Sequence, residues 1–145
     1  MYKHILVPTD GSKLSDRAIK EAGQLAAKLG AKITLLHTMP DQVWPMYAES
    51  AVVMAQFSRE DLRVESRTRA EELLAKAAKR TGITAATRLV FTDAPWDAIV
   101  KSTAKLKCDL VVMASHGRRG VTGFLLGSET QKVLTHCKVP VLVVR

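Results

Sequence analysis

Cysteine is scarce in this chain, and its placement suggests no chemistry. Of the 145 residues only two are cysteines, Cys108 and Cys137. They lie far apart in the sequence, form no C-x-x-C pair and have no histidine cluster with ligand spacing beside them, which excludes the usual zinc and dithiol motifs. We therefore expect no metal site and two reduced thiols near the edge of the core.

Long hydrophobic runs are missing as well. The apolar segment near the N-terminus covers only residues 5–7, which predicts that there is no signal peptide, and no run approaches the length of a membrane-spanning helix. These absences predict a cytoplasmic protein without a membrane partner. A chain of 145 residues, 47% hydrophobic and 25% charged, has the size and composition of one globular domain, which we expect to span residues 1–145.

Aromatic residues make up only 5% of the chain and are not interleaved with the basic residues. The formal net charge of +8 comes from 22 Lys and Arg against 14 Asp and Glu. A basic surface can attract nucleic acid, an anionic membrane or a polyphosphate. Here, however, the basic residues are scattered over the predicted helices and form no known reader motif, so we expect a solvated exterior and no specific nucleic-acid binding.

Two familiar nucleotide-binding signatures are also absent. The chain has no G-x-x-x-x-G-K-[ST] segment, and its first strand is followed by Pro-Thr-Asp-Gly-Ser instead of G-x-G-x-x-G. The first absence argues against a P-loop NTPase, and the second argues against a dinucleotide-dependent dehydrogenase.

What the chain does contain is an alternation of strand and helix patterns. Short, β-branched apolar runs typical of buried strands alternate with segments whose apolar residues recur every three or four positions. This alternation predicts right-handed crossovers and a doubly wound, Rossmann-like α/β fold with a five-stranded parallel sheet covered on both faces. The expected strands cover residues 5–7, 32–38, 85–91, 110–114 and 140–144, and the expected helices cover about 14–29, 58–80, 93–104 and a last segment from 128.

Local signals place the ends of these helices. Gly30 has the position of a C′ glycine after the first helix, and Asp93 is expected to cap the third helix, whose first turn tolerates Pro95. The residues expected on the inward face of that third helix are Trp96, Ile99, Val100, Thr103 and Ala104.

The end of the fourth strand carries the most informative pattern. Ligands of doubly wound sheets bind beyond the carboxyl ends of the strands, and here residues 110–114 are followed by glycines and by a helix that starts at Gly127 and Ser128. A helix start exposes unpaired amides, and glycine lets a phosphate approach the main chain without meeting a Cβ. The pattern therefore predicts a phosphate-binding turn, whose crevice Thr9 and Asp10 also reach from the first strand.

Several of these residues also have a purely structural interpretation. Asp10 is a candidate to bind ribose, base or a metal-bound water, but Asp10 or Ser12 is equally suited to an Asx turn or cap at the start of the first helix. Ser128 begins a predicted capping box with Gln131. Glu129 would repel an anion if it pointed inward, so we expect it to face solvent.

Two loops stay open to more than one interpretation. His116, Arg118 and Arg119 lie in the glycine-rich turn, where each side chain could touch phosphate or remain solvated. Residues 39–57, which include two prolines and several large apolar side chains, interrupt the periodicity. They could form a lid or a partner surface, or a loosely packed connection to the following helix.

Five segments carry a family resemblance: Ile5-Leu-Val-Pro-Thr-Asp-Gly-Ser, Leu35-Leu-His-Thr, Asp109-Leu-Val-Val-Met-Ala-Ser-His-Gly, Leu126-Gly-Ser and Pro140-Val-Leu-Val-Val. Together they resemble the universal stress protein family over essentially the full length of the chain. The ATP-binding branch of that family carries Gly, two residues, Gly, nine residues, then Gly and Ser or Thr. Here Gly117, nine further residues and Gly127-Ser128 match that spacing, whereas Ala114 replaces the first glycine.

The resemblance implies a site for ATP, with Mg²⁺ entering chiefly with the nucleotide. By position, Thr9 and Asp10 would approach the ribose and adenine, the Thr38 backbone would read the adenine edge, and Gly127 and Ser128 would bind the phosphates. The expected ATP-binding set is Pro8, Thr9, Asp10, Thr38, Met113, Ala114, Ser115, His116, Gly117, Arg118, Arg119, Gly127, Ser128 and Glu129.

The resemblance also implies a homodimer paired through the C-terminal strand, Val141–Val144. The expected function is a nucleotide-dependent stress-response switch with an unidentified protein partner and at most slow ATP hydrolysis, because Asp10 and His116 form no catalytic constellation. Two alternatives remain. One is a nucleotide-independent dimeric interaction module with a degenerate site marked by Ala114, and the other is an adenine-nucleotide hydrolase whose turnover Asp10→Ala would remove.

Overall fold

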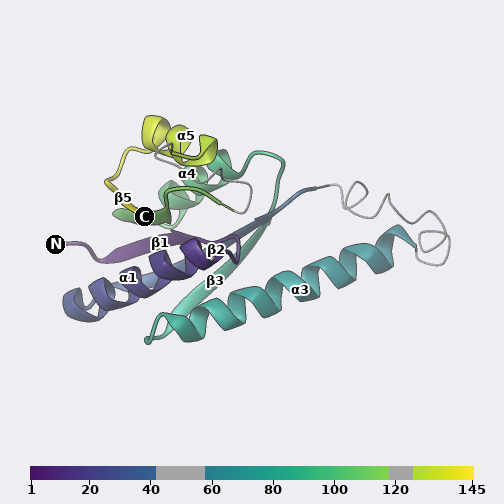
Figure 1. Cartoon of the computed structure of the whole chain (residues 1–145), viewed down its shortest axis with the longest axis horizontal. Coiled ribbons are helices and arrows are strands. Elements are labelled where there is room, and N and C mark those ends of the chain that lie inside the picture. Colours follow the sequence, from purple (N-terminus) through teal and green to yellow (C-terminus); the bar gives the residue numbers. More distant parts are fainter. Residues whose placement is uncertain (42–57, 118–125) are drawn as a thin grey trace.

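The computed structural model describes residues 1–41, 58–117 and 126–145, and these residues form an α/β fold around a five-stranded parallel sheet (Figure 1). The order of the strands is β3-β2-β1-β4-β5. This order confirms the predicted doubly wound, Rossmann-like sheet. The strands are β1 (His4–Pro8), β2 (Lys32–Met39), β3 (Ala85–Phe91), β4 (Leu110–Ala114) and β5 (Val141–Val144).

Helices cover both faces of this sheet. α1 and α3 lie on one face, and α4 and α5 lie on the other (Figure 1). The predicted alternation of strands and helices is confirmed within the described ranges. The helices there are α1 (Lys13–Leu29), α3 (Arg59–Arg80), α4 (Pro95–Lys105) and α5 (Ser128–His136). Of the segment 39–57, for which the sequence allows a lid or a partner surface, residues 42–57 lie outside the description.

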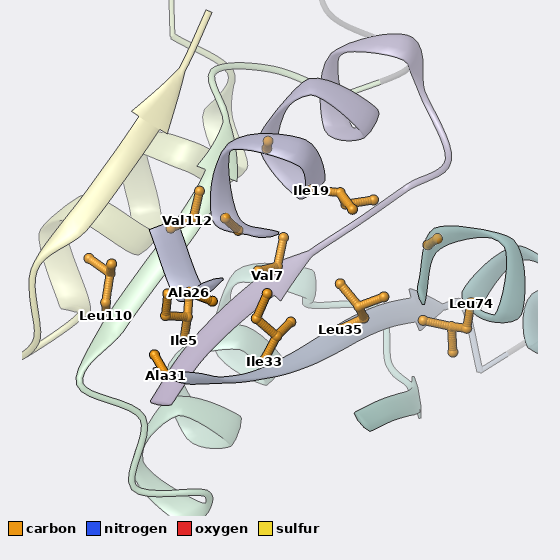
Figure 2. Packing of buried hydrophobic residues seen from close by; sticks show 13 residues of the cluster. Ile5, Val7, Ile19, Ala26, Ala31, Ile33, Leu35, Leu74, Leu110 and Val112 are labelled. Atoms are coloured by element: carbon orange, nitrogen blue, oxygen red, sulfur yellow. The ribbon is translucent and has the colours of Figure 1, made fainter. Parts of the chain in front are cut away.

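The two faces of the sheet form two separate cores. Successive strand residues point to opposite faces, so a strand covered on both sides reads as a continuous apolar run. Figure 2 shows Ile5 and Val7 of β1 in the first core with Ile19 of α1, and Leu74 of α3 beside Leu35 of β2. The second core contains the alternate strand residues together with α4 and α5: Leu6, Leu36, Val111 and Met113 with Ile99, Cys108 and Val133.

α1 begins and ends where the local sequence predicts. The Ser12 hydroxyl accepts the N–H of Ser15 at 3.1 Å and so caps the start of the helix. Gly30 adopts a left-handed conformation with φ of 64° after the last turn, which a residue without a Cβ does at little cost. The Ser12 cap fixes the first turn of α1 directly after the end of β1, next to the candidate site.

α4 differs from the prediction in its cap and in its inward face. Its N-cap is Ala94 and no side chain of its own caps it, so the expectation that Asp93 caps this helix is wrong. The helix begins at Pro95, and a side chain of α5 instead accepts the first free N–H of this helix. Ala104 is exposed, because the helix is turned so that the small residues Ala98 and Ser102 pack inward. The buried residues are Ala98, Ile99, Ser102 and Thr103.

Both cysteines are free, as predicted, with Cys108 buried and Cys137 half-buried. Burial, together with the carboxylate of Asp109, raises the pKa of the Cys108 thiol to about 11. Among the helices of the described ranges, none is both long enough and apolar enough to span a bilayer.

Candidate functional site

The strand order reverses between β1 and β4. β2 and β3 continue the sheet from one side of β1, whereas β4 and β5 continue it from the other. Ligands of doubly wound sheets bind beyond the carboxyl ends of the strands at such a reversal. Residues 9–12, which follow β1, and residues 115–117, which follow β4, therefore border the candidate site.

Thr9 is held from three directions at the end of β1. Its N–H donates to the Leu36 carbonyl at 2.8 Å, and its own carbonyl accepts from Nδ1 of His37 at 2.7 Å. Its hydroxyl is buried, lies 3.0 Å from the Ser15 hydroxyl and accepts the N–H of Gly11. The Thr9 side chain therefore shapes the turn between β1 and α1, so a ligand would meet this residue mainly through the turn that it holds.

Asp10 joins the turn after β1 to the turn after β4. Its Oδ1 accepts the N–H of Ser12 at 3.0 Å, which confirms the predicted Asx turn. Its Oδ2 lies so close to Gly117 that a Cβ at that glycine would be 2.7 Å away. The glycine at position 117 is thus the residue that lets the two turns meet, and the Asp10 carboxylate lies at their junction.

The turn after β4 is anchored to both of its neighbours. The Ser115 N–H donates to the Val144 carbonyl of β5 at 2.8 Å, and the Ser115 carbonyl accepts the N–H of Gly127 at 2.8 Å. A Cβ on Gly127 would lie 3.1 Å from the Cα of His116, tighter than ordinary van der Waals contact. Glycine at 127 therefore lets the start of α5 pack directly on the turn that follows β4.

α5 begins without a side-chain cap. Gly127 is its N-cap, in an extended conformation, and as a glycine it has no side chain to accept a first-turn amide. Ser128 is already the first helical residue and Gln131 donates to the Leu126 carbonyl at 3.0 Å, so the predicted capping box is wrong. A box needs the serine at the N-cap, and the helix starts one residue too early for that. Because the glycine N-cap does not use the first amides of α5, this helix start suits an anion.

The sequence predicts that Glu129 faces solvent. Instead, its side chain reaches across to α4. Its Oε2 accepts the N–H of Trp96 at 2.9 Å and its Oε1 accepts from Nζ of Lys132 at 3.0 Å. The next residue, Thr130, is buried, and its hydroxyl donates to the Ala114 carbonyl at 3.1 Å. The first turn of α5 is thus tied to α4 on one side and to the end of β4 on the other.

The main chain of Thr38 points toward the candidate site. β1 pairs with β2 only up to Leu36, whose carbonyl accepts the N–H of Thr9. The carbonyl of Met39 accepts from Thr92, beyond β3 on the opposite side. Because main-chain groups of successive strand residues point to alternate sides, those of Thr38 point to the side on which β1 has ended. The geometry fits the predicted contact with an adenine edge.

The remaining predicted site residues differ in what they can offer. The Met113 side chain is buried in the second core, its main chain points to β5 like that of Ser115 two residues later, and Pro8 closes β1. Arg118 and Arg119 lie outside the described residues. His116 is half-buried, with its Nδ1 3.1 Å from the Ser115 hydroxyl.

Three residues that support the site escaped prediction. Ser15 and His37 hold Thr9, and Thr130 holds the end of β4. The position of His37, directly after the apolar run of β2, was the one sequence signal for its role. A serine or threonine in a helix gives no such signal, because its side chain can equally well bond to its own helix.

A groove of about 240 Å³ lies beside Gly11, between the turn after β1 and helix α3. Its two arginines are paired with carboxylates: Arg80 with Asp16 at 3.2 Å, and Arg69 with Glu65. None of its lining residues belongs to β4 or α5, so it is distinct from the predicted phosphate turn. The groove is lined by Gly11, Arg69, Glu72, Leu73, Lys76 and Arg80.

Comparison with known proteins agrees with this fold. A model of the Universal stress protein family matches residues 1–145. The chain belongs to the universal stress protein family. A universal stress protein of Thermus aquaticus is 33% identical over 148 residues, covering 100% of both chains.

Solved structures related to this universal stress protein share its fold over nearly its whole length. One, solved to assign the biochemical function of a hypothetical protein, has a TM-score of 0.79 and 28% identity, and covers 99% of this chain and 96% of that one. A universal stress protein in complex with cAMP has a TM-score of 0.68 and 29% identity, and covers 99% of this chain and 97% of that one.

Proposed function

We propose that this universal stress protein binds an adenine nucleotide where the strand order reverses, with the phosphates at the start of α5. The observation that carries the proposal is that start itself: Gly127 is the N-cap, no side chain caps it, and its N–H is anchored on the Ser115 carbonyl at 2.8 Å. Free first-turn amides at the positive end of a helix attract phosphate. The cAMP complex of a similar protein supports an adenine nucleotide as the ligand class.

The proposed site divides the nucleotide between the two turns. Asp10 and the main chain of Thr38 would meet ribose and adenine near the end of β1, and Gly117 with the first turn of α5 would meet the phosphates. We take Mg·ATP as the ligand because the spacing of Gly117 and Gly127-Ser128 matches the ATP-binding branch of the family. Within the described residues no group of three His, Cys, Asp or Glu could hold a metal ion, so phosphate oxygens would carry most of the Mg²⁺ coordination.

We further propose that the bound nucleotide acts as a switch in a cytoplasmic homodimer, changing its contacts with a protein partner. Hydrolysis would be slow at most. The Asp10 carboxylate is engaged by the Ser12 N–H, and His116 is hydrogen-bonded to Ser115. Both groups already take part in hydrogen bonds that shape the turns, so we propose neither as a base for an attacking water.

The experiment is isothermal titration of the nucleotide-stripped protein with Mg·ATP, then with ADP and AMP. We expect saturable, micromolar binding that Gly127→Glu removes, because the new carboxylate would lie at the phosphates. Gln24→Glu, on an exposed position of α1, adds the same charge away from the site and is the matched control. Circular dichroism checks that both variants fold.

One observation favours a second candidate, a nucleotide-independent dimeric interaction module. Ala114 stands where the ATP-binding branch has its first glycine, and its carbonyl is occupied by the Thr130 hydroxyl. No heat and no thermal shift at millimolar nucleotide would establish this candidate. If the protein does bind ATP, partner capture that Gly127→Glu alters supports the switch, whereas unchanged capture contradicts it.

A further inference from the structure

Helix α4 lacks a cap of its own. Its N-cap residue, Ala94, has no side chain that can accept a hydrogen bond, and Pro95, the first helical residue, has no N–H to donate. The first amide that needs an acceptor belongs to Trp96, and it donates to Oε2 of Glu129 at 2.9 Å. A residue 33 positions later in the chain thus supplies the cap that α4 lacks.

The same carboxylate belongs to the first turn of α5, the helix whose amides face the proposed phosphate site. A carboxylate in a first turn is ordinarily attracted to the amides of its own helix. Here Glu129 gives one oxygen to Trp96 of α4 and the other to Nζ of Lys132. Its charge is therefore directed away from the amides that would bind an anion.

The link between the two helices has a second point of attachment. The ring of Trp96, at the start of α4, lies 4.7 Å from the ring of His136, the last residue of α5. Trp96 thus meets α5 at both ends, through its main-chain N–H at the start and through its ring at the finish. Trp96 and Glu129 are thus two points at which α4 and α5 meet.

We propose that Glu129 is a positioning residue of the nucleotide site: it ties the uncapped start of α5 to the start of α4 and keeps its own charge away from the phosphates. This inference rests on the proposed function, which it deepens. It makes the affinity of the site depend on two separate properties of one side chain, its hydrogen-bond acceptor and its charge.

Two substitutions separate these properties. Glu129→Gln keeps an oxygen that can accept from Trp96 but removes the charge, so we expect ATP to bind about two- to five-fold more tightly than to the wild type. The gain should be larger for ATP than for AMP and should shrink at high salt, since it arises from charge. Glu129→Ala removes both properties, so ATP should bind more weakly to it than to the Gln variant.

Hydrogen exchange reports the tie itself without any ligand. In Glu129→Ala the amide of Trp96 and the first turn of α5 should exchange faster than in the wild type, whereas Glu129→Gln should restore protection. Glu71→Gln removes an equal charge from an exposed position on α3, on the other face of the sheet, and should leave both measurements unchanged.

The outcomes distinguish this inference from the proposed function. The wild type could bind ATP while the Gln and Ala variants match it in affinity, in the difference between ATP and AMP, and in hydrogen exchange. In that case the positioning role is overturned and the nucleotide site stands. If the wild type binds no adenine nucleotide, the proposed function fails and so does the role of Glu129 in it. If Glu129→Ala then still exchanges faster than the wild type, the hydrogen bond from Trp96 to Glu129 serves only to cap α4.

Discussion

Asp10 is a single side chain on which both halves of the candidate site meet. Its Oδ1 organises the turn into α1 by accepting the Ser12 N–H, while its Oδ2 lies against the main chain of Gly117. The structural and the ligand-binding interpretations of this aspartate are therefore compatible, because the Asx turn leaves the carboxylate in the crevice. A side chain added at Gly117 would therefore displace the Asp10 carboxylate.

Substituting Gly117 tests this contact. In Gly117→Ala the new Cβ would lie 2.7 Å from Oδ2 of Asp10, so the carboxylate must move. Because a carboxylate at the end of a flexible side chain yields easily, we expect a stability loss of only about 1 kcal/mol but a clear loss of ATP affinity by titration. Asp10→Ala removes the clash together with its own Asx turn, so the double variant should be no less stable than Asp10→Ala alone, and affinity should not recover. Recovery of affinity in the double variant would contradict the role assigned to Asp10.

The two thiols should differ sharply in reactivity. Burial raises the pKa of Cys108 from 9.0 to about 11, which lowers its thiolate fraction near pH 8 about 100-fold. We expect iodoacetamide to modify Cys137 first in the native protein and both thiols equally in urea, as read by mass spectrometry. Equal labelling of both native thiols would contradict the burial of Cys108.

The raised pKa also makes the free energy of unfolding depend on pH. The stabilisation from the buried neutral thiol of Cys108 is complete below pH 9 and is lost as the pH rises toward about 11.

Among the elements, α1 packs directly against the end of α3 at Gly23. A Cβ at that position would lie 2.0 Å from the carbonyl oxygen of Thr81, a main-chain atom that cannot move aside on its own. Gly23→Ala, which would ordinarily stabilise a helix, should instead cost about 3 kcal/mol in urea unfolding. Ala27→Gly, at an exposed position of the same helix, should cost about 1 kcal/mol. A more stable Gly23→Ala protein would mean that the two helices lie farther apart in solution.

How far the sequence predicts these elements depends on where their determinants lie. The ends of α1 follow from Ser12 and Gly30, which are neighbours of the helix that they cap, and both were predictable. The cap of α4 comes from Glu129, which the fold brings there from α5, and no pattern near Ala94 reports it. Local signals thus predict local contacts, and long-range side-chain caps have to be found in the structure.

The same distinction applies to the candidate site. The glycine spacing and the strand ends identify Gly117, Gly127 and Asp10 as neighbours, because the topology of a doubly wound sheet brings strand ends together. The start of α5 at Gly127, one residue before the predicted cap, depends on the hydrogen bond from its N–H to Ser115, across the turn. That contact determines whether Ser128 caps the helix or leaves its amides open, and the sequence alone does not reveal it.

For the molecule as a whole, β5 is the edge at which a second copy would extend the sheet. β4 lies on one side of β5, and Leu142 is 44% exposed, unusual for a large apolar side chain. A strand edge carries main-chain donors and acceptors that a partner strand can pair. The proposed homodimer through Val141–Val144 therefore makes a prediction about particular main-chain groups.

The alternation of main-chain groups along β5 identifies those groups. The carbonyls of Pro140 and Val144 accept from β4 and from the residue after it, so the main chain of Val143 points to the outer edge. Val143→Pro removes an outward N–H and should give a folded monomer by sedimentation velocity, because proline cannot donate to a new partner strand. Leu142→Pro removes an inward N–H instead and should lower the unfolding midpoint. If Val143→Pro stays dimeric with normal stability, the two copies meet at a surface other than β5.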